Sequence, residues 1–229
     1  MKRFTAVITA AVTAALLLCS CLAVRDAEGG ELIKKAREEY KALDSARVVI
    51  TNTATGDIDQ VFTFKYDEKD ILLFSYEGRS EKNEYAQYSN GMELFTYDNG
   101  EESYLQKGDK GFVLYNRAST HPQADEGMIL YSPSAVSEAT VSEEEGVTHI
   151  HHVYDVDKIG AEAESGKVTS FTADYYFKGE ELLYFMETTG FEDNGEAKEY
   201  SCRIDITDRN SVDKVENTVK ALKEREKVQ

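Results

Sequence analysis

The feature that most restricts the fold of this chain is a regular alternation of aromatic and smaller residues over short segments. In residues 59–66 (DQVFTFKY), one side of an extended chain carries Phe62, Phe64 and Tyr66. Successive side chains of a β-strand point to opposite faces, so this period of two predicts a strand with one apolar face. Asn90-Gly91 separates two further segments of this kind, and this dipeptide is typical of a tight antiparallel hairpin.

Similar segments recur along most of the chain and predict one large sheet. They are residues 46–53, 59–66, 71–76, 84–89, 92–97, 102–106, 112–116, 137–142, 147–156, 167–177, 181–189 and 199–207. Short turns rich in Gly, Asn and Asp connect many of them, which favours an antiparallel order. The prediction is a mainly β (α+β) fold with a large antiparallel sheet of about ten strands. Such a sheet with one apolar face must curve or be covered.

Three segments can cover that face. Residues 31–43 (ELIKKAREEYKAL) have the spacing of an amphipathic helix. Residues 119–136 contain both prolines of the chain and predict a loop with a short helix. Residues 211–227 place apolar residues three and four apart, which predicts a C-terminal helix. The apolar side of the first helix consists of Leu32, Ile33, Ala36, Tyr40 and Leu43.

The N-terminus has the pattern of an export signal. A basic start is followed by an apolar run at 4–18, which is shorter than the about twenty residues of a membrane-spanning helix. The next residues, Leu18-Cys19-Ser20-Cys21, resemble the bacterial lipobox. This resemblance implies that residues 1–20 are removed and that Cys21 becomes the diacylated first residue of a tether at 21–30. Two acyl chains suffice for stable membrane attachment, so we expect an extracytoplasmic protein anchored to a bacterial membrane.

Three other interpretations of the N-terminus have less support. They are a cleaved signal without a lipid, an uncleaved membrane anchor, and a metal site at the two neighbouring cysteines. A metal site would need further ligands at useful spacing, and the one remaining cysteine is Cys202.

The charge of the chain excludes one class of partner. The formal net charge is −17 at pH 7, which argues against binding to nucleic acid or to an anionic membrane surface. Solubility is the plainest explanation of this charge. No internal linker or repeat divides the chain, so we expect residues 31–229 to form a single domain.

The order of these segments resembles the bacterial lipoprotein-carrier superfamily, which includes LolA/LolB-like proteins and lipid-carrying lipoproteins of mycobacteria. The shared features over roughly 31–210 are an anchor and tether, one helix, a long meander, a loop bounded by prolines, and more strands. The resemblance implies an unclosed barrel around a hydrophobic cavity that is plugged by a helix and accepts acyl chains.

The resemblance also implies which residues contact the ligand. On the sheet these are Phe62, Phe64, Tyr66, Phe74 and Tyr76, and on the helix Leu32, Ile33, Ala36 and Tyr40. Met128, Ile129, Leu130 and Tyr131 would form a mobile lid. The residues alone permit another interpretation, in which all these aromatic side chains are ordinary close-packed core.

Two histidines on one strand form the best candidate for a metal site in the sequence. His149 and His151 share a strand face, with Cβ atoms ~7 Å apart, and could hold zinc or copper with a carboxylate from a neighbouring strand. Solvated or hydrogen-bonded histidines are the favoured explanation, because Ile150, His152 and Tyr154 occupy the opposite, apolar side. We therefore predict no metal.

No other pattern supports catalysis. Asp155 and Asp157 begin like a calcium loop, but Gly166 stands where a bidentate Glu is needed. Cys202 alternates with Tyr200, Ile204 and Ile206, which predicts a buried thiol rather than a nucleophile. The chain contains no motif of a hydrolase, metalloprotease, P-loop or dinucleotide-binding enzyme, so we expect neither an enzyme nor a cofactor.

Two hypotheses for function remain. The first is a lipid-anchored protein that binds or carries an acyl chain or similar hydrophobic small molecule on the concave side of its sheet. The alternative is an envelope protein-interaction or sensor module without a small-molecule ligand.

Overall fold

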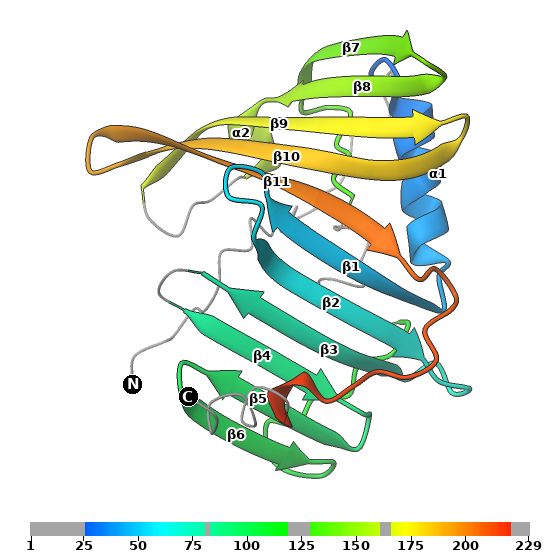
Figure 1. The fold of residues 1–229 in the computed structure, drawn as a ribbon, viewed down its shortest axis with the longest axis vertical. Coiled ribbons are helices and arrows are strands. Elements are labelled where there is room, and N and C mark those ends of the chain that lie inside the picture. Colours follow the sequence, from blue (N-terminus) through cyan, green and yellow to red (C-terminus); the bar gives the residue numbers. More distant parts are fainter. Residues whose placement is uncertain (1–25, 81–82, 119–128, 161–165, 221–229) are drawn as a thin grey trace.

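The computed structural model describes residues 26–80, 83–118, 129–160 and 166–220. These residues form one eleven-stranded antiparallel sheet with two short helices, α1 (Gly30–Lys41) and α2 (Val156–Ile159) (Figure 1). The strands are β1 (Ser45–Asn52), β2 (Ile58–Tyr66), β3 (Leu72–Arg79), β4 (Glu84–Ser89), β5 (Glu93–Asp98), β6 (Glu101–Gln106), β7 (Val136–Glu144), β8 (Val147–Tyr154), β9 (Lys167–Lys178), β10 (Glu181–Asp193) and β11 (Glu196–Thr207). The predicted class, a mainly β fold with a large antiparallel sheet, is confirmed.

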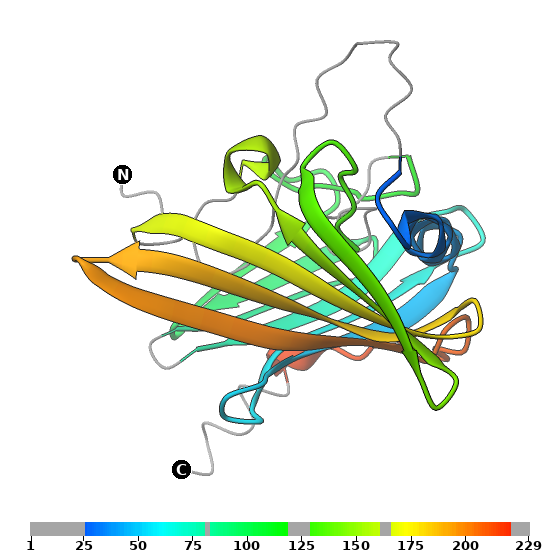
Figure 2. The same ribbon diagram turned by 90° about the horizontal axis from the view of Figure 1, so that it is seen from above.

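The sheet consists of two meanders that meet in its middle. The strand order is β6-β5-β4-β3-β2-β1-β11-β10-β9-β8-β7, so β1 pairs with β11 although they lie far apart in sequence. In this central pair Ile50 lies opposite Ile204. The outer strands β6 and β7 do not pair with each other, and the sheet curves without closing (Figure 2).

Tight turns account for much of this topology. Asn99 and Gly100 have φ values of 48° and 90°, and Asn194 and Gly195 have 53° and 80°. Two successive positive φ angles are the requirement of a type I′ turn, whose twist matches that of the strands that it joins. Asn followed by Gly meets this requirement with little strain, so these dipeptides fix the β5–β6 and β10–β11 hairpins.

Helix α1 covers the concave face of the sheet (Figure 2). Ile33, Ala36 and Tyr40 are buried on its inner side, as predicted, whereas Leu32 is half-buried. The prediction that the central loop covers the concave face is confirmed only for its described part. Residues 129–135 lie on the concave side and do not form a helix. None of the helices in the described residues is both long and apolar enough to span a membrane.

The prediction of a helix over 211–227 is wrong for residues 211–217 and holds for residues 218–220, where the described part of the chain ends. Residues 212–217 are irregular and cross the convex face of the sheet, and helical geometry begins at Thr218 (Figure 1). The Lys65 ammonium donates hydrogen bonds to the carbonyl oxygens of Val212 and Asp213, both at 2.9 Å. In a helix these carbonyl groups would instead accept hydrogen bonds from main-chain amides of the next turn. Val219 then packs against Ala86 and Tyr97, along with the partly buried Tyr88 and Phe95, so this segment covers the outer rather than the inner face.

One further local prediction needs correction. Residues 112–116 do not form a strand, because the chain turns away from β6 and makes one isolated bridge, from Asn116 to Ile71. The short helix predicted within 119–136 is absent from the described residues 129–135, and the rest of that loop lies outside the described residues. A short helix that was not predicted, α2, follows β8. There Asp155 caps the helix by accepting a hydrogen bond from the Asp157 amide, and Gly160 ends it in the left-handed region.

Candidate functional site

The concave face of β2 and β3 forms a continuous aromatic wall. The five residues proposed for ligand contact on these strands are all buried on this face: Phe62, Phe64, Tyr66, Phe74 and Tyr76. The ring centroids of Phe62 and Phe64 lie 5.5 Å apart, and those of Phe62 and Phe74 6.2 Å apart. The structure therefore brings this predicted set together, and the rings pack against one another.

Helix α1 lies directly on this wall. The ring of Tyr40 meets the ring of Phe64 edge-on, with centroids 6.0 Å apart. Ile33 and Ala36 are buried in the same apolar cluster, and Leu32 packs against its border. In this arrangement the helix side chains occupy the space next to the wall.

A second cover, residues 129–131, is held by hydrogen bonds to its main chain. Ile129, Leu130 and Tyr131 are buried, whereas Met128 lies outside the described residues. The hydroxyl groups of Tyr175 and Tyr154 both donate to the Leu130 carbonyl, at 2.5 and 3.3 Å. We call residues 129–131 the strap.

The strap is also joined to the N-terminal end of α1. The Tyr131 hydroxyl donates to the Asp26 carboxylate at 3.1 Å, and the Arg37 guanidinium donates to the Tyr131 carbonyl at 2.9 Å. A Cβ atom at Gly30 would overlap the Tyr131 hydroxyl, so this close approach requires glycine. Burial, together with the nearby Asp26 charge, raises the pKa of Tyr131 to about 12, which keeps its hydroxyl available as a donor.

His152 connects the same region to the sheet. Its ring is completely buried, and burial lowers its pKa, so the neutral form is favoured. Nε2 lies 2.9 Å from the Glu28 carbonyl and donates to it, whereas Nδ1 has no partner within the described residues. The segment that enters α1, the strap and β8 thus form one connected unit.

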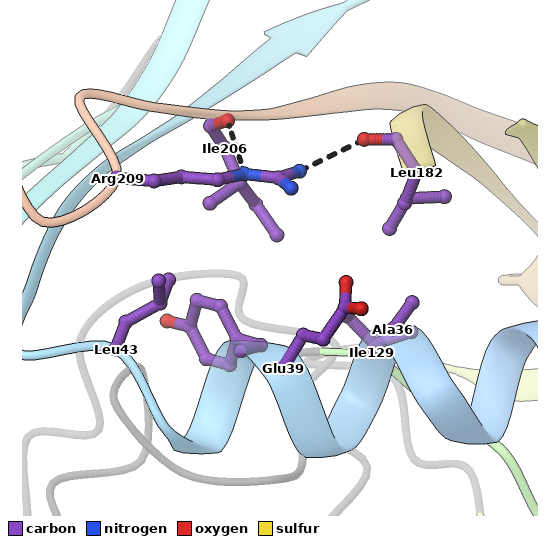
Figure 3. Close-up of a pocket in the computed structure, with 8 residues that line it drawn as sticks. Ala36, Glu39, Leu43, Ile129, Leu182, Ile206 and Arg209 are labelled. Carbon is purple, nitrogen blue, oxygen red and sulfur yellow. Dashed lines mark hydrogen bonds between the residues drawn. The ribbon is translucent and has the colours of Figure 1, made fainter. Parts of the chain in front are cut away.

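A small cavity remains between α1 and the ends of β10 and β11 (Figure 3). Its volume is about 20 Å³, which is room for a water molecule but not for an acyl chain. Arg209 lies at its edge and donates to the carbonyl oxygens of Leu182, at 2.8 Å, and Ile206, at 3.3 Å. The lining residues are Ala36, Glu39, Tyr40, Leu43, Ile129, Leu182, Ile206 and Arg209.

The sequence could indicate only part of this cavity lining. Ala36 and Tyr40 were proposed from the helical pattern, and Ile206 belongs to the predicted buried side of its strand. Glu39 and Arg209 carry no such signal, because one lies on the polar side of a helix and the other in a turn after β11. Cys21 lies outside the described residues, so its predicted acylation stays a prediction.

The other proposed constellations lie away from this site. His149 and His151 share the convex face as predicted, and both contact the same carboxylate oxygen of Asp174, at 2.7 and 2.8 Å. The His149 ring also stacks on Tyr176, with centroids 4.6 Å apart. Within the residues that the structure describes, no group of three His, Cys, Asp or Glu side chains is arranged to hold a metal ion.

Cys202 is buried on the concave face, in agreement with its predicted environment. Burial, with the neighbouring charge of Glu187 as the next contribution, raises the pKa of the Cys202 thiol to about 12. The thiol is therefore protonated at neutral pH, a state in which it is a poor nucleophile.

Comparison with solved structures finds twelve similar chains. The chain resembles the crystal structure of LprF from Mycobacterium bovis with a TM-score of 0.45 and 11% sequence identity, over 83% of this chain and 96% of that chain. No family model matches the chain. No curated protein matches it in sequence.

Proposed function

We propose that this chain is a lipid-anchored extracytoplasmic protein that binds a hydrophobic ligand with an acyl chain on the concave face of its sheet. The observation that carries the proposal is the construction of the cover. Helix α1 lies on the aromatic wall, Tyr115 contacts Phe74 of that wall, and the strap lies against Tyr154 and Tyr175 of β8 and β9. Within the described residues, this cover contains no second sheet. The proposal includes no catalytic step, cofactor or metal.

A ligand must displace this cover, because the cavity beneath it has a volume of only about 20 Å³. Moving α1 away exposes Ile33 and Tyr40, and burial of a large apolar side chain contributes about 1.5–3 kcal/mol. A ligand that buries about ten methylenes on the same wall gains about 8 kcal/mol. Long acyl chains can therefore offset the opening of α1, whereas short ones cannot.

The anchor is the second part of the proposal. The lipobox-like Leu18-Cys19-Ser20-Cys21 supports acylation of Cys21 and export of the domain from the cytoplasm of a bacterium. Asp26, Ala27 and Glu28 contact the strap and β8, so the tether enters the domain beside the cover. A Cys21→Ser chain that still fractionates with membranes would contradict the anchor.

Ligand binding can be tested with the mature chain carrying Cys21→Ser and the neutral fluorescent probe N-phenylnaphthylamine. We expect saturable binding, and uptake should be several-fold faster in Tyr131→Phe, because this variant loses the hydrogen bonds that join the strap to Asp26 and Ala27. Stopped-flow fluorescence measures both quantities. Mass spectrometry of organic extracts should also detect an apolar compound that is purified with the chain.

Tyr104→Phe is the matched control for this experiment. Tyr104 is an exposed tyrosine on β6 whose hydroxyl also donates to a carboxylate, that of Glu93, but it lies far from the strap in the fold. Its uptake rate should equal that of the unaltered chain. Absence of saturable binding together with an extract free of apolar compounds would contradict the proposal.

The free sheet edges favour a second candidate, a module that binds another envelope protein. Both β6 and β7 are mostly exposed, and an edge strand offers unpaired main-chain groups to a partner strand. The acidic residues of both edges oppose non-specific pairing. One specific protein crosslinked through β6 or β7, with no apolar compound in the extract, would favour this candidate over the first.

A further inference from the structure

Glu187 is an acidic residue placed on the apolar side of the sheet. In the strand register it lies opposite Ala173 of β9 and Cys202 of β11. Both neighbours are buried on the concave face, so the side chain of Glu187 points to the same side. The residue as a whole is half-buried.

The carboxyl of Glu187 has no protein partner in the described ranges, neither a hydrogen-bond donor nor a cation. Other half-buried carboxylates of the sheet are paired. Asp174 contacts two histidines, and Asp205 forms an ion pair with Arg203 at 2.7 Å. An unpaired acid in an apolar setting destabilises a fold, and its presence therefore calls for another explanation.

Two tyrosine hydroxyl groups near Glu187 are already engaged with another acceptor. The hydroxyl groups of Tyr154 and Tyr175 are engaged with the Leu130 carbonyl of the strap. The thiol of Cys202 is at best a weak donor. Burial raises the pKa of Glu187 to about 7, so the carboxyl can ionise near neutral pH once a cation approaches.

We propose that Glu187 binds the protonated amine of an amphiphile whose hydrocarbon chain lies on the aromatic wall. This inference rests on the proposed function and specifies the ligand's polar end. A carboxylate in apolar surroundings forms a strong charge-assisted hydrogen bond with an ammonium group and repels an anionic head group.

The arginines around the concave face do not offer an equivalent site for an anion. Arg37 donates to the Tyr131 carbonyl, and Arg209 is held by two main-chain carbonyl groups. Arg117 is paired with Asp44 and Asp70. The charge of the entire chain, −17, adds to the preference for a cationic head group.

The test compares three amphiphiles of equal chain length as competitors of N-phenylnaphthylamine, namely dodecylamine, dodecanol and dodecanoate. The mature chain with Cys21→Ser is used at about 0.15 M salt, which screens attraction to the acidic surface. We expect dodecylamine to displace the probe at roughly tenfold lower concentration than dodecanol, with dodecanoate the weakest. In Glu187→Gln this advantage of the amine should fall to about twofold or less, while dodecanol is unaffected.

Glu199→Gln is the matched control. It removes the same charge from an exposed position on β11 and should retain the full advantage of the amine. An amine that competes no better than the alcohol, or an advantage that survives in Glu187→Gln, would overturn the role of Glu187 and leave ligand binding intact. Failure of all three compounds to displace the probe, or of the probe to bind, would instead overturn the proposed function with it.

Discussion

The Phe74→Ala chain is expected to have a free energy of unfolding about 3–5 kcal/mol lower than the unaltered chain. Phe74 is completely buried, and its ring contacts Phe62 and Tyr115, with centroids 6.2 and 5.8 Å away. Removal of the ring loses its transfer free energy and leaves a hollow in the wall. Urea denaturation, followed by far-UV circular dichroism, measures the difference.

Val113→Ala is the control for this prediction, because Val113 is 46% exposed and should change stability by less than about 0.5 kcal/mol. The same experiment shows whether a ligand can occupy the hollow that the missing ring leaves in the aromatic wall. A long-chain ligand that occupies the hollow of Phe74→Ala would restore stability by mass action. A loss below about 1 kcal/mol without any ligand would mean that the ring is not part of a close-packed core.

The concave wall was predictable because its signal is local. Phe62, Phe64 and Tyr66 alternate with residues of the other face, and this alternation alone assigns them to one side. The inner side of α1 follows from helical spacing in the same way. What the pattern does not determine is whether the enclosed space is filled, since that depends on how the covers meet the wall.

The C-terminal segment was not predictable for a related reason. Its valines have helical spacing, yet Lys65, more than a hundred residues earlier in the chain, binds the carbonyl groups of Val212 and Asp213. A tertiary contact of this kind overrides local propensity. Residues 112–116 show the same limit, because Phe112 and Tyr115 of this largely apolar segment pack on the core although the segment does not pair as a strand.

Charged residues in the candidate site had the weakest signal in the sequence. The alternation in β10 places Glu187 on the same side as Phe185. In a chain with 43 acidic residues, however, the sequence gives no reason to select this Glu as a site residue. Only the register with Cys202 and Ala173 identifies it as an acid on the apolar face. Its position has a measurable consequence for stability.

The Glu187→Gln chain is expected to be more stable than the unaltered chain at pH 8, by up to about 3 kcal/mol, and equally stable at pH 4. Burial raises the pKa of Glu187 from 4.5 to about 7 in the folded chain. Between these two values the folded chain holds a proton that the unfolded chain has released, so the free energy of unfolding falls as the pH rises. Glutamine does not ionise and therefore avoids this loss.

The neighbours of Glu187 do not produce this pH dependence themselves. Burial raises the pKa of Tyr154, Tyr175 and Cys202 far above neutral pH. Urea denaturation of ligand-free chains at pH 4 and pH 8 gives the two differences. Glu199→Gln should alter stability by less than about 0.5 kcal/mol at both pH values. If Glu187→Gln changed stability equally at pH 4 and pH 8, the carboxyl would not be buried in the way that its register implies, and its proposed role toward an amine would lose its physical basis.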